Sequence, residues 1–306
     1  MLSYSVVGTG AIGGFYGGRL AHAGRTVRFL LHSDYEYVKQ HGLQVDSCDG
    51  NFMLPHVEAY RHAEEMPPSD VILVALKSVN NHDLLPKLLR PLIHEGVTVV
   101  LIQNGIGLED DLQGVFPDLN IVAGLAFICR AKVGPGHIRH QDFGSINLGN
   151  FSCPEDRFEA LLSDIRDAGL TAAEVPYLEA RWKKAVWNMP FNGMTVALNT
   201  STDKLLNTLA TRQLIYDLMM EVVGAAQALG VSTLTSEFAD RMMETTDRMV
   251  PYSPSMKLDF DCWRPMEIEY LYSRPIAEAR KAGFEMPKLA MLEAELRFIE
   301  KMNLTH

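Results

Sequence analysis

The chain has 306 residues, of which 47% are hydrophobic and 22% charged, values typical of a globular protein long enough to form two domains. Its formal net charge of −10 argues against a surface that binds nucleic acid or an anionic membrane. No apolar run approaches the roughly 18 residues that span a bilayer, and no basic signal-peptide segment precedes the first strand-like run, so we expect a cytoplasmic protein.

The first half of the chain alternates strand-like and helix-like segments. Strands are expected at residues 4–8, 26–32, 71–76, 97–102, 121–131, 145–149 and 170–175, with helices at 11–23 and 155–168. The runs at 71–76 and 97–102 are apolar throughout, which is typical of parallel strands buried on both faces. Strands separated by helices predict an α/β domain with a Rossmann-type, doubly wound sheet.

The second half, after Pro176, has a helical pattern, with amphipathic segments at residues 211–229, 236–249 and 288–301. We therefore predict a dinucleotide-binding domain over 1–176 and an all-α substrate and catalytic domain over 177–306. The long helices could pack within one chain or form a homodimer, and the sequence leaves both open.

The cysteines and histidines give no pattern of a metal site or a disulfide. The four cysteines are scattered without a CxxC pair, which predicts reduced thiols. His137 and His140 lie near Asp142, but the surrounding GPGHIRHQDFG is typical of a glycine-punctuated hairpin and lacks the spacing of a ligand set. We therefore expect no metal.

The segment VVGTGAIG follows the first strand and opens the first helix. Gly8 would allow the tight turn, Gly10 would let the backbone approach a pyrophosphate, and Gly13 would let the helix pack closely on the strand. The diphosphate would lie over the helix N-terminus at Ala11 and Ile12, where backbone N–H groups and the helix dipole favour negative charge. The segment predicts a dinucleotide site.

The end of the second strand bears on the choice between NAD and NADP. Enzymes that prefer NAD place an acidic residue there to bind the ribose 2′-hydroxyl. Here the strand ends in His32 and Ser33, which could donate hydrogen bonds to a 2′-phosphate, while Asp34 could cap the next helix. We favour NADPH over NADH as the cofactor.

Two later strands also end in polar residues. Lys77 follows the strand at 71–76 and is placed to meet a phosphate or a substrate carboxylate. Asn104 follows the strand at 97–102 and is placed to meet the nicotinamide ribose or the substrate. Ligands of such sheets bind beyond the carboxyl ends of the strands, so both residues are candidates for the cofactor site. Alternatively, they are a solvated lysine and a turn-forming asparagine.

The helical half carries a second group of polar residues in the segment ARWKKAVWNMPFNGMTVALN. Lys184, Asn188 and Asn192 recur every four residues, although Pro190 should kink or end the helix between the last two. We interpret them as a pocket wall and Lys183 as a solvated residue. Ser255 and Glu267 lie in a later segment. A lysine ammonium can supply both charge and a proton to a carbonyl being reduced, and a nearby carboxylate can orient it.

Taken together, VVGTGAIGG, VALKS, IQNGIG, WKKAVWN, SMKLD and EIEYL resemble the ketopantoate reductase family in order and spacing along the whole chain. The resemblance implies an N-terminal Rossmann-type domain, a helical C-terminal domain, and reduction of 2-dehydropantoate (ketopantoate) to (R)-pantoate with NADPH on the route to pantothenate and coenzyme A. It further implies that Lys184 is the general acid and that Glu267 is the active-site glutamate. Substrate-binding positions would be Asn188, Asn192 and Ser255, and the cofactor positions would include Gly8, Gly10, Gly13, Lys77 and Asn104.

The chain departs from the family pattern at three places. Better-known members carry an arginine where this chain has His32, they read INPLTAL where this chain has MPFNG, and Thr202 stands in place of a further asparagine. Two alternatives therefore stay open. One is a reductase of another branched 2-oxo acid, and the other is a protein that binds NADP as a sensor without catalysis.

Overall fold

The computed structural model describes residues 1–305, which separate into two compact units. The first unit contains residues 1–103 and 108–177, and the second contains residues 104–107 and 178–306. The division between Tyr177 and Leu178 lies one residue from the boundary expected from the sequence. The segment 104–107 packs with the helical unit although it follows a strand of the first, which the sequence pattern did not indicate.

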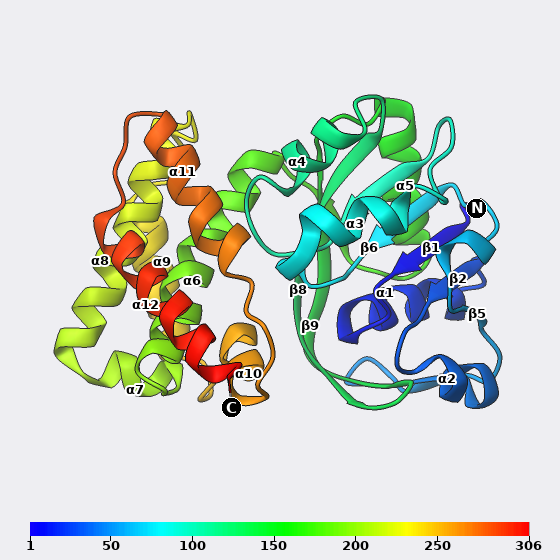
Figure 1. Ribbon diagram of the computed structural model, residues 1–306, viewed down its shortest axis with the longest axis horizontal. Coiled ribbons are helices and arrows are strands. Elements are labelled where there is room, and N and C mark those ends of the chain that lie inside the picture. Colours follow the sequence, from blue (N-terminus) through cyan, green and yellow to red (C-terminus); the bar gives the residue numbers. More distant parts are fainter. Residues whose placement is uncertain (306) are drawn as a thin grey trace. The chain divides into compact units, whose positions relative to one another are not determined.

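The first unit is built on one ten-stranded sheet in the order β4-β3-β9-β8-β7-β6-β1-β2-β5, with β10 pairing with β9 (Figure 1). The strands are β1 (Tyr4–Val7), β2 (Val27–Leu30), β3 (Leu43–Ser47), β4 (Phe52–Leu54), β5 (Glu58–Tyr60), β6 (Val71–Val74), β7 (Thr98–Leu101), β8 (Asn120–Gly134), β9 (His137–Asn150) and β10 (Ala172–Glu174). The helices are α1 (Ala11–His22), α2 (Tyr35–His41), α3 (Asn81–Leu89), α4 (Leu108–Val115) and α5 (Glu155–Asp167), with short 3₁₀ turns η1 (Ala63–Glu65) and η2 (Ser78–Asn80).

The strand directions confirm the predicted doubly wound sheet and extend it. Strands β5, β2, β1, β6, β7 and β8 are parallel. The long hairpin β8–β9 then reverses direction, and β3 and β10 run parallel to β9. This hairpin turns at Pro135 and Gly136, inside the segment that the sequence marked as a hairpin. The sequence did not predict β3, β4 and β5, because strands of three to five residues with partly exposed side chains leave too short a pattern.

Small residues let α1 lie very close to the sheet. A side-chain carbon added to Gly14 would come within 2.1 Å of Ile138, one added to Gly17 within 2.6 Å of Val6, and one added to Gly18 within 3.2 Å of Leu43. The face of α1 that carries these glycines is therefore its contact surface with the sheet. Larger residues would push the helix off β1, β3 and β9 and open voids in the core.

The remaining helices of the unit cover both faces of the sheet. Buried side chains of α5, such as Phe158 and Ile165, share one apolar cluster with Phe15 of α1 and Val6 of β1. The crossovers from β6 through α3 to β7 and from β7 through α4 to β8 run in the opposite direction along the sheet from the one through α1. Because such crossovers are right-handed, α3 and α4 lie on the face opposite α1 (Figure 1).

The second unit is helical, as expected. Its helices are α6 (Tyr177–Ala197), α7 (Thr202–Asn207), α8 (Leu209–Ala228), α9 (Ser236–Asp247), α10 (Ser255–Asp261), a π-helical turn η3 (Glu269–Ser273), α11 (Arg274–Lys281) and α12 (Pro287–Asn303). They enclose a core that includes Trp182, Phe191 and Tyr272. Of the two effects expected of Pro190, a kink or an end to the helix, the second does not occur, since α6 continues through it to Ala197.

The length and polarity of these helices bear on membrane insertion. In the part of the chain that the structure describes, none of them combines the length and the apolar character that crossing a bilayer requires.

Candidate functional site

The glycine turn between β1 and α1 has the geometry that its three glycines predict. Gly8 has a φ of +96°, and a side-chain carbon there would lie 2.6 Å from the backbone nitrogen of Leu76. A carbon on Gly13 would lie 2.3 Å from the carbonyl oxygen of Gly8, so the helix can approach the strand only with glycine. A carbon on Gly10 would meet nothing within 4 Å, which leaves open space above the turn.

The open space lies at the N-terminus of α1. Gly10 is the N-cap residue, and among the described residues no side chain caps this helix end. The first turn, which includes Ala11 and Ile12, also carries no acidic residue. An N-terminus with neither a cap nor a carboxylate favours an anion, because the backbone N–H groups and the dipole both attract negative charge. The turn therefore fits a dinucleotide pyrophosphate.

The residues that follow β2 comprise two exposed polar side chains and one buried carboxylate. His32 and Ser33 are exposed, whereas Asp34 is buried. The Asp34 carboxylate accepts hydrogen bonds from Lys132 (2.6 Å), from the Gly136 backbone (2.9 Å) and from the Ser33 hydroxyl (3.1 Å). Asp34 is the N-cap residue of α2, as the sequence suggested, but its side chain does not cap the helix. It ties the end of β2 to the β8–β9 hairpin instead.

The Asp34 contacts predict an acid-dependent contribution to stability. Burial opposes ionisation, but the hydrogen bonds from Lys132 and Gly136 outweigh it, so the pKa of Asp34 is lowered. A group with a depressed folded-state pKa stabilises the fold above its unfolded value of about 3.9, and this contribution is lost as the pH falls through the folded-state pKa. Asp34→Asn should therefore destabilise the first unit at pH 7, with a smaller difference from wild type at pH 3. Urea denaturation at pH 7 and at pH 3 measures the free energy of unfolding of the variant and of the wild type. A difference between the two proteins that is the same at both pH values would contradict the prediction.

The other predicted cofactor residues lie at the ends of neighbouring strands. Because β2, β1, β6 and β7 are parallel and adjacent, their carboxyl ends share one edge of the sheet. His32, Gly8 and Lys77 follow three of these strands, and Lys77 is exposed. Gln103 follows β7 and exchanges two hydrogen bonds with Asn81. Asn104 comes next and belongs to the segment that packs with the helical unit.

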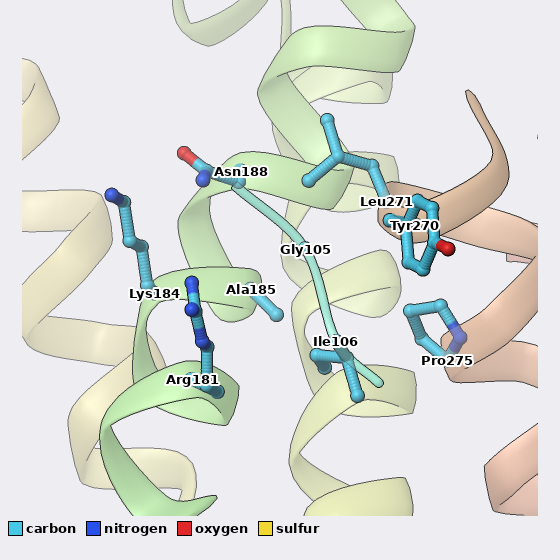
Figure 2. A pocket seen from close by; sticks show the side chains of 9 residues that line it. All are labelled: Gly105, Ile106, Arg181, Lys184, Ala185, Asn188, Tyr270, Leu271 and Pro275. Atoms are coloured by element: carbon cyan, nitrogen blue, oxygen red, sulfur yellow. The ribbon is translucent and has the colours of Figure 1, made fainter. Parts of the chain in front are cut away.

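The helical unit has a small polar pocket beside α6. Lys184 and Asn188 line it, and their side chains lie on successive turns of the helix (Figure 2). The segment Gly105–Ile106 forms another wall, because the Ile106 backbone N–H donates to the Tyr270 carbonyl oxygen (3.0 Å). The cavity volume is about 10 Å³, which is roughly the space that one water molecule occupies.

Arg181 is a pocket residue that the sequence interpretation missed. It is 3% exposed and lines the same cavity one turn before Lys184 (Figure 2). Its spacing of three residues from Lys184 places both on one helix face and could have identified it. The cavity lining therefore includes two cationic side chains and one amide.

Asn192 and Ser255 come together through the backbone of α10. Asn192 is 2% exposed; its side chain donates to the Asn188 carbonyl oxygen (2.9 Å) and accepts from the Met256 backbone N–H (3.1 Å). It therefore anchors the first turn of α10, where Ser255 is half-buried, next to α6. Neither residue lines the small cavity beside Lys184, so their role in substrate binding stays a prediction.

The remaining predicted residues have clear environments. Glu267 is 4% exposed and lies two residues before the π-helical turn η3, which carries Tyr270. Lys183 is partly exposed and pairs with Glu179 one turn earlier, which confirms the solvated interpretation. Thr202 donates to the Tyr252 carbonyl oxygen (3.2 Å) and is buried. All four cysteines are free thiols.

The chain resembles known proteins along nearly its whole length. A family model described as ketopantoate reductase PanE/ApbA matches residues 4–152, and the model of its C-terminal part matches residues 177–300. A 2-dehydropantoate 2-reductase from Nostoc sp. is 42% identical over 309 residues, covering 99% of this chain and 96% of that protein.

Solved structures agree in fold. The 2-dehydropantoate 2-reductase of Geobacter metallireducens has a TM-score of 0.92 and 38% identity, covering 97% of this chain and 99% of that one. A D-mandelate dehydrogenase solved with NADH and anilino(oxo)acetate has a TM-score of 0.88 at 22% identity, covering 98% of this chain and 99% of that one. At that identity the likeness shows the fold alone.

Proposed function

The chain belongs to the ketopantoate reductase family, and from this premise we propose that it reduces 2-dehydropantoate to (R)-pantoate with NADPH. The observation that supports this most directly is the pocket that Arg181, Lys184 and Asn188 line, since the substrate is a carboxylate with a carbonyl to be protonated. The family is one of pyridine-nucleotide-dependent oxidoreductases that act on CH–OH groups, and the glycine turn fits such a cofactor.

The two units supply different parts of this chemistry. NADPH, when bound, supplies the hydride that is added to C2 of the substrate. Gly8, Gly10 and Gly13 shape the turn for its pyrophosphate. Lys77 and Asn104 follow β6 and β7, which are parallel to β1 and end at the same edge of the sheet as that turn. Lys184 donates a proton to the developing alkoxide, and Asn188 and Arg181 hold polar groups of the substrate. Glu267 orients the lysine.

The preference for NADPH rests on the end of β2. His32 is an exposed donor there and Ser33 is exposed as well, while the nearby Asp34 carboxylate is engaged by the Ser33 hydroxyl, Lys132 and the Gly136 backbone. A carboxylate turned away in this manner does not compete for the ribose 2′-hydroxyl or repel a 2′-phosphate. Hydrogen bonds to a charged group contribute about 1.5–3 kcal/mol, so NADPH should bind roughly 10- to 100-fold more tightly than NADH.

The test is NADPH oxidation on addition of 2-dehydropantoate, with dissociation constants for NADPH and NADH measured in parallel. Turnover with NADPH and tighter NADPH binding are expected, and His32→Asp should remove the preference by introducing a carboxylate. Equal or tighter NADH binding by the wild type would overturn the NADPH assignment. NADPH binding without turnover across a panel of branched 2-oxo acids would instead favour a sensor.

We also infer a cytoplasmic location. Cys48 and Cys262 are exposed free thiols, which suits a reducing compartment. The partner expected for the site is the small-molecule 2-oxo acid, and the net charge of −10 argues against nucleic acid or an anionic membrane.

A further inference from the structure

The three residues that follow β2 lie where the proposed function places the 2′-phosphate of NADPH, yet they include no lysine or arginine. His32 and Ser33 are exposed there. The Ser33 hydroxyl donates to the Asp34 carboxylate (3.1 Å), so its proton is already engaged. Enzymes that use NADP generally accommodate the 2′-phosphate with an arginine near this strand end. A preference for NADPH therefore needs a cation from another part of the fold.

Lys132 reaches this strand end from the β8–β9 hairpin. The pairing of β8 with β7 ends at Ala123, but β8 continues to Gly134 and carries the hairpin to the start of α2 (Figure 1). The Lys132 Nζ lies 2.6 Å from the carboxylate of Asp34, which directly follows Ser33 in the chain. The ammonium, the carboxylate and the serine hydroxyl thus form one connected group at the end of β2.

The backbone around Lys132 fixes its position. The Gly136 backbone N–H donates to Asp34 (2.9 Å), and the Gln44 backbone N–H donates to the Gly136 carbonyl oxygen (2.8 Å), so the hairpin tip is tied to α2 and to β3. Lys132 stands opposite Ile138 in the β8–β9 ladder, and the Ile138 side chain is 2% exposed. The ammonium is therefore held beside Asp34 before any cofactor binds.

The carboxylate that Lys132 contacts is charged. Burial alone would raise the pKa of Asp34, but the hydrogen bonds from Lys132 and the Gly136 backbone lower it overall, so the carboxyl is ionised at neutral pH. An uncompensated carboxylate would repel a nearby phosphate, and an acidic residue at the end of this strand is the arrangement that binds the ribose 2′-hydroxyl of NADH. The ammonium offsets the repulsion and occupies a carboxylate oxygen.

Two other cations lie near the start of α2, but their contacts are with the helix. The Arg61 guanidinium lies over the Tyr35 ring, 5.9 Å from its centroid, and 3.4 Å from the exposed Glu36 carboxylate. The Lys39 ammonium donates to the Tyr35 hydroxyl (2.9 Å). Both cations therefore contact α2 itself, whereas Lys132 contacts the carboxylate at the strand end.

We propose that Lys132 determines the preference for NADPH over NADH by compensating the charge of Asp34, an inference that rests on the proposed function. With the lysine in place, the Asp34–Lys132 pair presents no net charge to a 2′-phosphate. Without it, the same strand end would carry the acidic residue that is typical of NAD-dependent enzymes. One lysine in a distant hairpin would thus decide between two cofactors that differ in a single phosphate.

Dissociation constants test this role. NADPH and NADH are measured by fluorescence, and adenosine 2′,5′-bisphosphate and adenosine 5′-monophosphate by calorimetry, because this second pair reports on the adenosine end alone. Lys132→Gln keeps a hydrogen-bond donor for Asp34 but removes the charge, so it should weaken NADPH binding by about tenfold and change NADH binding by less than about threefold. The bisphosphate should follow NADPH, and the monophosphate should follow NADH.

Two further variants separate the charge of Lys132 from its packing. Lys132→Arg keeps the charge and should keep the preference for NADPH. Asp34→Asn combined with Lys132→Gln leaves no charge to compensate, so NADPH binding should return to within about threefold of the wild type. Continued weak NADPH binding in a folded double variant would overturn the proposal, and Lys132→Gln with Lys132→Arg decides the question if the double variant does not fold.

Arg61→Gln is the matched control. It removes an exposed cation from the same part of the first unit and should change the ratio of the NADPH and NADH dissociation constants by less than about threefold. A larger loss of NADPH binding in Arg61→Gln than in Lys132→Gln would assign the phosphate to Arg61 and contradict the role of Lys132.

The wild type and Lys132→Gln together distinguish failure of this role from failure of the proposed function. The Lys132 side chain is 33% exposed, so its replacement should leave the core intact, which circular dichroism and NADH binding check. If the wild type prefers NADPH and Lys132→Gln shows the same preference, the role of Lys132 alone is refuted. Equal binding of NADPH and NADH by the wild type would overturn the NADPH assignment and this role with it.

Discussion

Lys184→Ala is expected to lower the turnover of 2-dehydropantoate by about 10²–10⁴-fold, the usual contribution of a general acid. Lys184 lines the polar pocket beside Asn188, on the helix face that Arg181 also occupies. The variant should still bind NADPH, because the glycine turn belongs to the other unit. Turnover is followed by NADPH absorbance and binding by NADPH fluorescence.

The neighbouring Lys183 provides the control. It differs from Lys184 by one position, is partly exposed, and pairs with Glu179 on the helix surface. Lys183→Ala should therefore keep nearly normal turnover, since it removes a surface charge of the same kind. Near-normal turnover in Lys184→Ala, or equal losses in both variants, would refute the role of Lys184 as the acid.

Features set by neighbouring residues in the chain could be predicted from the sequence. The turn at Gly8, Gly10 and Gly13 follows from steric needs that act within a few residues, and the geometry of all three agrees with them. The pairing of Lys184 with Asn188 on one face follows from the helical period. The same period places Arg181 on this helix face. A long cationic side chain next to a tryptophan is, however, typical of an exposed position when its burial is not known.

Features set by distant parts of the chain could not be predicted in this way. The β8–β9 hairpin brings Lys132 to Asp34, and nothing in either segment specifies the other. Similarly, Asn192 looks like a continuation of the Lys184 face, yet its amide anchors α10 through the Met256 backbone. Pro190 does not end α6, because the helix is buried on several sides and packing outweighs one lost hydrogen bond.

Asp164→Asn is expected to destabilise the first unit by about 3–5 kcal/mol, since it leaves a buried charge without its partner. The Asp164 carboxylate accepts hydrogen bonds from the Tyr4 hydroxyl (2.7 Å) and from Arg25 (3.1 Å), and both charged side chains are at most 10% exposed. Burial and the contact with Asp164 raise the pKa of Tyr4, so it stays a donor. An asparagine keeps the size of the side chain but cannot neutralise Arg25.

Two comparisons separate this effect from a general loss of surface charge. Glu36→Gln removes an exposed carboxylate of the same unit, paired with Arg61 at 3.4 Å, and should cost less than about 1 kcal/mol. Arg25→Gln combined with Asp164→Asn should recover part of the loss, because no unpaired charge then remains buried. Urea denaturation combined with hydrogen exchange of β1 and α5 amides measures the stability of the first unit separately from that of the second. A double variant no more stable than Asp164→Asn would show that the loss comes from packing, not from the uncompensated charge of Arg25.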